Sequence, residues 1–128
     1  MFERRVPVRW RDTDAQGHVN HAVFLTYLEE GRDAFYAQAI GAEPNYVVVR
    51  IEVDRRAEVR HLDQHVTVRI QAERLGTTSL TTRETILTPS GEVAAAARVV
   101  SVRWDPGQHQ PIPFSDVERT RLSAALPG

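Results

Sequence analysis

Residues 21 to 40 read HAVFLTYLEEGRDAFYAQAI, and their apolar residues recur with the period of an α-helix. The apolar positions fall on one face of that helix: Val23, Phe24, Tyr27, Leu28, Gly31, Phe35 and Ala39. The charged positions avoid this face: Glu29, Glu30, Arg32 and Asp33. Asn20 is placed to be the N-cap and Gly41 to be the C-cap. The stretch therefore predicts one amphipathic helix, which must bury its apolar face against the rest of the chain.

Gly31 lies on the apolar face of this helix. A glycine inside a helix costs about 1 kcal/mol relative to alanine, so its presence there requires a reason. We expect the helix to approach another backbone closely at this position.

Strand-like stretches lie on both sides of the helix. Before it, residues 2 to 10 alternate Phe2, Val6, Val8 and Trp10 with charged residues, which predicts a half-buried strand. After it, four more stretches are typical of strands and are separated by turn residues: 46 to 59, 66 to 74, 78 to 88 and 92 to 104. Residues 115 to 125 are expected to form a short terminal helix with Ser115 as its N-cap.

One strand, one long helix and then four strands predict an α+β domain with an antiparallel sheet. The apolar face of the helix and that of the sheet have only each other to bury, so the helix is expected to lie across a five-stranded sheet. The chain has 128 residues and contains no repeat or linker-like stretch. Residues 1–128 are therefore expected to form a single domain.

The composition excludes several classes of chemistry. Cysteine is absent, which excludes disulfides, zinc–thiolate sites and a cysteine nucleophile. All 16 basic residues are arginines, so Schiff-base chemistry on a lysine is excluded as well. The net charge of −1 provides no basic field for nucleic acid. No apolar run is long enough to cross a membrane and no signal peptide is recognised, so a cytoplasmic location is expected.

The densest polar cluster, RDTDAQGHVNH, spans residues 11 to 21 and ends where the helix begins. A helix N-terminus presents unpaired N–H groups and a partial positive charge, which stabilise an oxyanion or lower the pKa of a carboxylate. Asp12 is expected to cap the loop. A metal site formed with His18 and His21 is not expected, because their spacing requires both on one helix, and Gly17 and the helix cap Asn20 stand in the way.

Residues Trp10 to His21, followed by Phe24 to Arg32, resemble the signature of the 4-hydroxybenzoyl-CoA thioesterase family. That signature is Asp-x-Asp-x-x-Gly-His-Val-Asn, followed by an aromatic residue and Glu-x-x-Arg. Order and length agree over nearly the whole chain. The resemblance implies a hotdog fold, an antiparallel five-stranded sheet wrapped around one long helix. It also implies hydrolysis of an acyl thioester of CoA or acyl carrier protein without a cofactor, in a homodimer or homotetramer whose active site lies at the dimer interface.

The resemblance assigns the catalytic carboxylate to Asp14, which either attacks the thioester carbonyl or activates the water that does. The backbone N–H of His21 is expected to polarise the carbonyl oxygen. Gly17 is expected to let the loop approach the substrate without a Cβ in the way. His18 is expected to act beside Asp14 or to brace the loop. Asn20 is expected chiefly to cap the helix, and it is also a candidate substrate contact.

Three arginines are candidates for the CoA phosphates, because a guanidinium donates paired hydrogen bonds to such groups: Arg55, Arg56 and Arg60. A solvated run of charge is the other interpretation of this segment. Thr78 and Ser79, at a strand junction, are further candidate substrate contacts. Between positions 54 and 63 the chain departs from the family, with Glu58 where proline is common and Leu62 where glycine is common.

Two other functions stay open. A hotdog hydratase or dehydratase would use Asp14 and His18 for acid–base chemistry, although the proline expected near its histidine is missing. A non-catalytic module that binds acyl-CoA is the other, and the unusual segment 54 to 63 keeps it open. Glu29, Glu30 and Arg32 are expected to face solvent or another subunit.

Overall fold

A computed structural model of the protein describes residues 1–41 and 45–127. Its elements follow in the order β1 (Phe2–Pro7), α1 (His21–Ile40), β2 (Tyr46–Arg55), β3 (His65–Leu75), β4 (Ser79–Leu87), β5 (Val93–Asp105), β6 (Gln110–Pro111) and α2 (Asp116–Ala124). Two short 3₁₀ turns, Trp10–Asp12 and His61–Asp63, precede α1 and β3. The predicted order of strand, long helix and four strands is confirmed.

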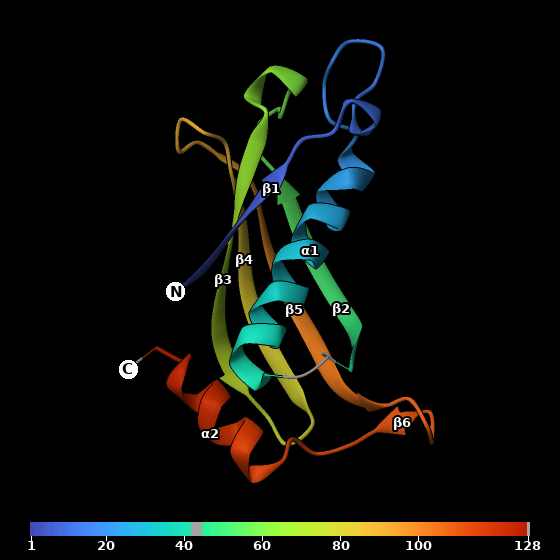
Figure 1. The fold of residues 1–128 in the computed structure, drawn as a ribbon, viewed down its shortest axis with the longest axis vertical. Helices are drawn as coiled ribbons and strands as arrows, with labels where there is room; N and C mark the ends of the chain where they lie inside the picture. The colour runs from blue at the N-terminus through green and yellow to red at the C-terminus, as the bar shows by residue number, and fades with distance from the viewer. Residues whose placement is uncertain (42–44, 128) are drawn as a thin grey trace.

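The strands form one antiparallel sheet in the order β1-β3-β4-β5-β2, and the two-residue β6 adds to β5. The sheet curls around α1, which lies in its concave face (Figure 1). This is the predicted hotdog architecture. Asn20 accepts a hydrogen bond from the Ala22 N–H, and Gly41 adopts a left-handed conformation, so both predicted caps of α1 are confirmed.

The core lies between α1 and the sheet. The helix buries the predicted apolar face, and the strands oppose it with β-branched and leucine side chains that are at most 1% exposed: Val66, Val68, Ile70, Leu80, Ile86 and Val99. A Cβ added to Gly31 would lie 2.9 Å from the Cβ of Val68 on β3. The helix does pack closely at this position, but the expected neighbour was wrong, since a strand side chain rather than another backbone lies against Gly31.

The prediction for Trp10 was wrong. Strand β1 ends at Pro7, and the Trp10 side chain is 78% exposed in a 3₁₀ turn. The turn forms because the Asp12 carboxylate accepts a hydrogen bond from the Arg9 N–H at 3.0 Å. A side chain to main chain bond of this kind competes directly with continuation of the strand.

The predicted strand 46 to 59 is shorter than expected and ends at Arg55. The N–H groups of Arg56 and Ala57 both donate to the carbonyl oxygen of Ala94, which turns the chain away from β5. Strand β2 is also an edge strand, since its hydrogen-bonded neighbour in the sheet is β5. Its residues Ile51 and Val53 are 37% and 41% exposed, so the protomer covers the apolar side chains of this strand only in part.

Arg32 corrects a second expectation, because it neither faces solvent nor lies on the surface. It is 3% exposed and makes two hydrogen bonds to the Glu84 carboxylate on β4, at 2.9 and 2.7 Å. The Thr82 hydroxyl donates a third hydrogen bond to Glu84 at 2.7 Å. Burial opposes the charge of Arg32, but the neighbouring carboxylate offsets this and raises the guanidinium pKa above its usual value.

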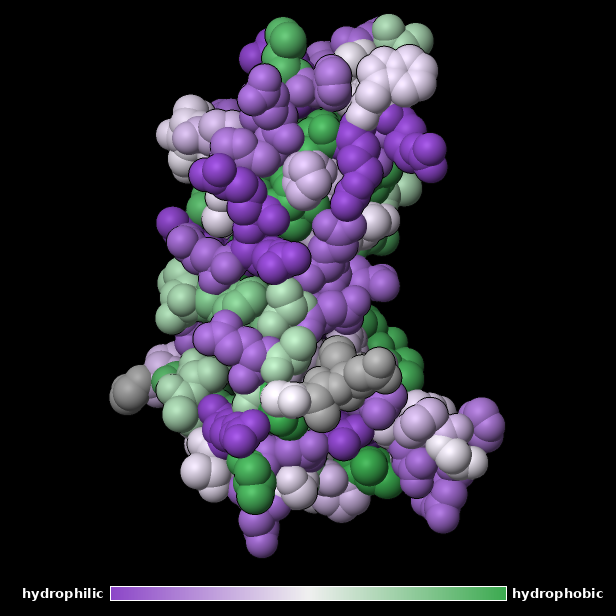
Figure 2. Space-filling model, viewed as in Figure 1, coloured by the Kyte–Doolittle hydropathy of each residue, from purple (hydrophilic) through white to green (hydrophobic). Residues whose placement is uncertain are grey.

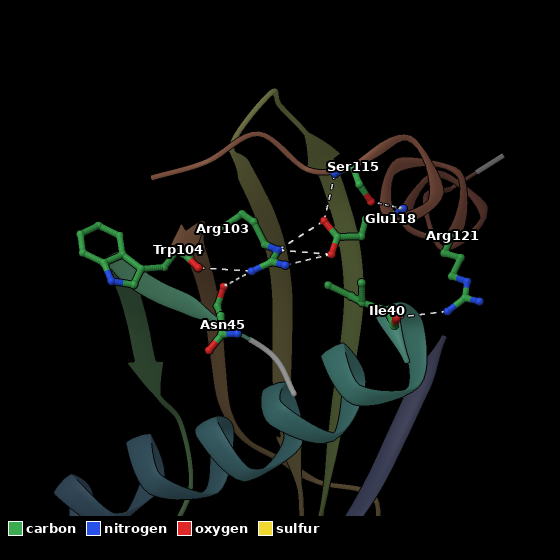
Figure 3. A network of polar contacts seen from close by, with 7 residues as sticks. All are labelled: Ile40, Asn45, Arg103, Trp104, Ser115, Glu118 and Arg121. Atoms are coloured by element: carbon green, nitrogen blue, oxygen red, sulfur yellow. Dashed lines mark hydrogen bonds and ion pairs between the residues drawn. The ribbon is translucent and has the colours of Figure 1, made fainter. Parts of the chain in front are cut away.

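The second helix closes the lower end of the molecule in Figure 1. Ser115 caps it through a reciprocal pair of hydrogen bonds with Glu118, which confirms that prediction. Glu118 also binds Arg103 at the end of β5, and Arg121 donates to the last carbonyl of α1, that of Ile40 (Figure 3). Within the described ranges no helix is long and apolar enough to cross a membrane.

Candidate active site

The loop between β1 and α1 is a small, hydrogen-bonded unit. Thr13 and Val19 pair across it, and the Asp14 N–H donates to the His18 carbonyl at 2.8 Å. At its tip Gly17 has φ +79°, a conformation that side chains other than glycine disfavour. A Cβ on Gly17 would meet nothing within 4 Å. Within the protomer, glycine is therefore favoured at this position by its positive φ and not by crowding.

The same loop is anchored to the segment that follows β2. Val19 donates to the carbonyl of Val59 at 2.7 Å, and His61 donates to the carbonyl of Gly17 at 3.0 Å. Val19 and Val59 are at most 1% exposed, so an apolar contact supports the loop from below. Figure 2 shows mainly hydrophilic residues on this upper end of the molecule, with hydrophobic residues visible between them.

Asp14 is exposed, and one of its oxygens is held by the loop. Its Oδ1 atom accepts hydrogen bonds from the backbone N–H groups of Gln16 at 2.8 Å and His18 at 3.2 Å. These two bonds hold the pKa of the carboxyl below its usual value of 3.8. Within residues 1–41 and 45–127 no donor reaches the Oδ2 atom. The carboxylate is therefore ionised at neutral pH, and its second oxygen is accessible.

Asp12, two residues earlier, is engaged with structural partners. Its Oδ2 atom accepts hydrogen bonds from the Arg9 N–H at 3.0 Å and from the Tyr27 hydroxyl at 2.6 Å. It is 9% exposed, and the predicted loop-capping role is confirmed. Burial, together with the bond to Asp12, raises the pKa of Tyr27 above its usual range. Tyr27 was predicted only as an apolar residue, and nothing in the spacing indicated its hydroxyl's partner.

The start of α1 completes the upper end of the molecule. The Asn20 side-chain oxygen accepts the Ala22 N–H at 3.0 Å, and the Asn20 N–H donates to the carbonyl of Asp12. His21 is the first residue of the helix and is exposed. In the part of the chain that the structure describes, no group accepts a hydrogen bond from the His21 N–H. The geometry therefore leaves this donor available beside the Asp14 loop.

His18 carries a charged neighbour that sequence spacing did not indicate. Its Nδ1 atom lies 3.5 Å from the Glu58 Oε2 atom, and the same oxygen lies 2.6 Å from an Arg55 nitrogen. The Arg55 guanidinium stands 5.3 Å from the ring centroid of Phe24 in the first turn of α1. Arg55 and His18 also contribute to the lowered pKa of Asp14. Four polar groups thus meet here: Asp14, His18, Arg55 and Glu58.

Comparison with known proteins identifies the family of this chain. The model of the thioesterase-like superfamily matches residues 8–124. The chain belongs to the thioesterase-like superfamily. A thioesterase of Thermus thermophilus, solved with coenzyme A and zinc, is 37% identical with a TM-score of 0.84, over 96% of this chain and 92% of that one. A protein of Bacillus stearothermophilus described as a predicted thioesterase is 31% identical with a TM-score of 0.87, over 99% and 98%. No protein of curated function matches significantly.

The Thermus relative was solved with zinc. Among the described residues, no group of three or more histidine, aspartate or glutamate side chains is arranged to hold a metal ion. His18 and His21 lie on either side of the helix cap, as the sequence indicates. The donor set of the loop therefore does not fit a metal, and no step of a reaction is assigned to one.

The other predicted contacts lie in two places. Arg56 and Arg60 follow β2 beside the Asp14 loop, and a backbone bridge joins Arg60 to His18. Thr78 and Ser79 lie at the connection from β3 to β4, which is at the opposite end of the protomer from the start of α1 (Figure 1). Within one protomer the structure does not bring these two residues near Asp14, because β4 runs the length of the molecule between them and the loop.

Among the described residues, the two best-defined grooves are not lined by the Asp14 loop. One of about 740 Å³ lies between β1, the end of α1 and α2. The other, of about 760 Å³, lies between β1 and the outer flank of α1. Asp14 is itself exposed in the protomer, whereas small-molecule sites are usually enclosed on several sides.

Proposed function

We propose that the protein is an acyl-CoA thioesterase of the 4-hydroxybenzoyl-CoA thioesterase type, with Asp14 as its catalytic carboxylate. The observation that carries this proposal is the ionised, exposed Asp14 carboxylate, with one oxygen held by two N–H groups and the other accessible. Membership in the thioesterase-like superfamily and the CoA-bound Thermus relative support the choice of a CoA thioester.

In the proposed reaction the carbonyl oxygen of the thioester accepts a hydrogen bond from the His21 N–H, where the positive end of α1 also stabilises negative charge. Asp14 removes a proton from a water molecule while the oxygen of that water bonds to the carbonyl carbon. The carbon–sulfur bond of the resulting tetrahedral intermediate then breaks, and the thiolate leaves. The proton held by Asp14 passes to that thiolate, so the products are the free acid and CoA.

Direct attack by Asp14 is the alternative route, and it forms a mixed anhydride between the Asp14 carboxyl and the acyl group. Water then hydrolyses the anhydride and regenerates the carboxylate. A single turnover in ¹⁸O-labelled water distinguishes the routes. Label in the Asp14 carboxyl supports direct attack, whereas label only in the product acid supports activation of water.

The test of the proposed function is release of CoA from short, long and aromatic acyl-CoAs by the wild type and by Asp14→Asn. The amide oxygen of the variant still accepts the Gln16 and His18 N–H groups, so the loop is kept. We expect kcat/KM to fall about 1,000-fold, since general base catalysis contributes roughly 100- to 10,000-fold. Asp63→Asn is a matched control, because Asp63 also accepts one backbone N–H, that of Arg60 at 2.8 Å.

Equal activity of the wild type and Asp14→Asn would remove Asp14 from the mechanism. Hydration of an enoyl-CoA without CoA release would favour the hydratase. Binding of CoA without turnover of any substrate in the panel would favour a non-catalytic module.

The proposal assigns the CoA phosphates to Arg56 and Arg60. Both are exposed beside the Asp14 loop, and within the described residues neither guanidinium makes an ion pair. Arg55 is the weaker candidate because Glu58 already binds it. Replacing Arg56 and Arg60 with alanine is expected to raise KM for acyl-CoA about tenfold and to leave kcat unchanged. An unchanged KM would refute this assignment.

Pairing of two protomers is proposed to enclose the site. Strand β2 supports this, because it is an edge strand with exposed apolar residues, a combination that other chains readily pair with. Its end at Arg55 lies beside the Asp14 loop, so a second protomer at this edge would cover the open surface around Asp14. Val53→Arg is expected to shift the mass measured by light scattering from dimer or tetramer toward monomer and to lower kcat/KM in parallel. A wild-type protein that is monomeric and active would refute the pairing.

A further inference from the structure

We infer that Glu58 is a positioning residue that fixes the tautomer and orientation of the His18 imidazole beside Asp14, so that the Nε2 atom of His18 faces the reaction as a hydrogen-bond acceptor. The catalytic part of this inference rests on the proposed thioesterase function. The tautomer itself is a property of the protein alone and can be measured without a substrate.

The contact that carries the inference is that between His18 Nδ1 and Glu58 Oε2, 3.5 Å apart. This is an ion-pair distance, longer than an aligned hydrogen bond, as is common for active-site groups before substrate binds. In a neutral imidazole one nitrogen carries the proton and the other accepts. A carboxylate accepts but does not donate, so it favours the proton on the nitrogen that faces it. Glu58 therefore favours Nδ1–H and leaves Nε2 as the acceptor.

The backbone holds both residues in place for this contact. His18 pairs with Arg60 in an isolated antiparallel bridge, and the neighbouring Val19 N–H donates to the carbonyl of Val59 at 2.7 Å. Glu58 directly precedes Val59, which is fully buried. The histidine and the glutamate thus belong to two segments in register with each other, and their side chains are brought together by main-chain bonds rather than by chance contact on the surface.

Arg55 orients the Glu58 carboxylate. Its guanidinium lies 2.6 Å from the same Oε2 atom that faces His18, and it rests over the Phe24 ring. The charged residues near His18 are Glu58, which follows β2, and Arg55 at the end of β2, which binds Glu58. Asp14 belongs to the same loop as His18, and the backbone of Arg60 pairs with that of His18. Within the described residues, Glu58 is the charged group in ion-pair contact with the imidazole.

An acceptor at Nε2 has a specific use in thioester hydrolysis. The attacking water has two protons, of which Asp14 takes one. The Nε2 atom of His18 would orient the water by accepting a hydrogen bond from its second proton. That proton is kept in the product acid. No further reactant is required, and the bond changes remain those of the proposed reaction. Orientation of this kind raises kcat, and it leaves substrate affinity unchanged because Glu58 does not touch the substrate.

The direct test is the ¹⁵N chemical shift of the two His18 ring nitrogens, measured above the pH at which the imidazole loses its charge. The wild type is expected to show mainly Nδ1–H. Glu58→Ala is expected to show mainly Nε2–H, and the matched control Glu3→Ala, which removes an exposed glutamate paired with Arg69, is expected to resemble the wild type. A wild-type protein with mainly Nε2–H, or identical shifts in Glu58→Ala, would overturn the inference.

Kinetics provide the second arm. Glu58→Ala is expected to lower kcat about tenfold with KM within about twofold, and Glu58→Gln, which keeps an acceptor oxygen, about threefold. In a His18→Gln background Glu58→Ala is expected to have no further effect, since the two residues act through one contact. Independent effects of the two substitutions would count against the inference. If the wild type releases no CoA, the proposed function fails, while the ¹⁵N shifts still decide the role of Glu58.

Discussion

Charged residues near the middle of α1 and those near its N-terminal end differ in burial and in hydrogen bonding. In the middle, Arg32 and Glu84 are buried and bind each other through two hydrogen bonds. At the N-terminal end, Asp14, His18 and Glu58 are partly or fully accessible and their contacts leave polar atoms available. A charge whose bonds are all made inside the protein holds the fold together. A charge that is oriented but incompletely bonded can act on a substrate.

The largest effect is expected when the buried pair of Arg32 and Glu84 is broken. Arg32→Met leaves the Glu84 carboxylate buried with the Thr82 hydroxyl as its remaining hydrogen-bond donor. We expect the free energy of unfolding in urea to fall by about 3 to 5 kcal/mol, because an uncompensated charge remains in the core. The control is Arg69→Met, which breaks an exposed pair with Glu3 and is expected to cost under about 1 kcal/mol. Similar losses of unfolding free energy in both variants would show that the buried pair matters no more to stability than the exposed one.

Gly31→Ala tests how tightly α1 is packed beside the buried pair. Alanine favours the helix by about 1 kcal/mol, but its Cβ would overlap Val68. Overpacking costs about 1 to 3 kcal/mol, so a net loss of unfolding free energy is expected. The cost should shrink when Val68→Ala is present, which makes room for the new methyl group. A variant more stable than the wild type would show that β3 yields at this point.

Asp12→Asn and Asp14→Asn compare a buried carboxylate with an exposed one in the same loop. We expect Asp12→Asn to destabilise the fold by about 1 to 2 kcal/mol, since two donors lose a charged, buried acceptor. Asp14→Asn should change stability much less than Asp12→Asn, as is usual for an exposed site. Thermal unfolding of both variants measures the difference. The reverse ranking would mean that Asp14 serves mainly as a structural cap.

The smallest effect concerns pH. The N–H groups of Gln16 and His18 favour the ionised form of Asp14, so its pKa in the folded protein lies below the usual 3.8. The stability that these bonds contribute is fully present above the pKa of the unfolded chain. It is lost as the pH falls through the lower folded value. A ¹³C titration of the Asp14 carboxyl, with a peptide of residues 11 to 21 as reference, is expected to place the folded transition at lower pH. Coincident titrations would contradict it.

The sequence by itself determined the elements and most of the loop. The period of residues 21 to 40, the caps Asn20 and Gly41 and the cap Ser115 depend on neighbours a few positions away, and the structure has them as predicted. The loop that holds Asp14 is likewise local, since its oxygen binds N–H groups two and four residues along the chain. The role of Asp14 in catalysis stays a prediction.

Tertiary structure alone decided which charges are buried and which groups meet. Arg32 looks like a surface residue of an amphipathic helix, and only the curl of the sheet brings Glu84 to it from 52 positions away. Glu58 reaches His18 only because Val59 and Val19 pair between two distant segments. Thr78 and Ser79, expected near the substrate, lie at the other end of the protomer. A local pattern fixes the direction of a side chain within its element, whereas the register between elements selects its partner.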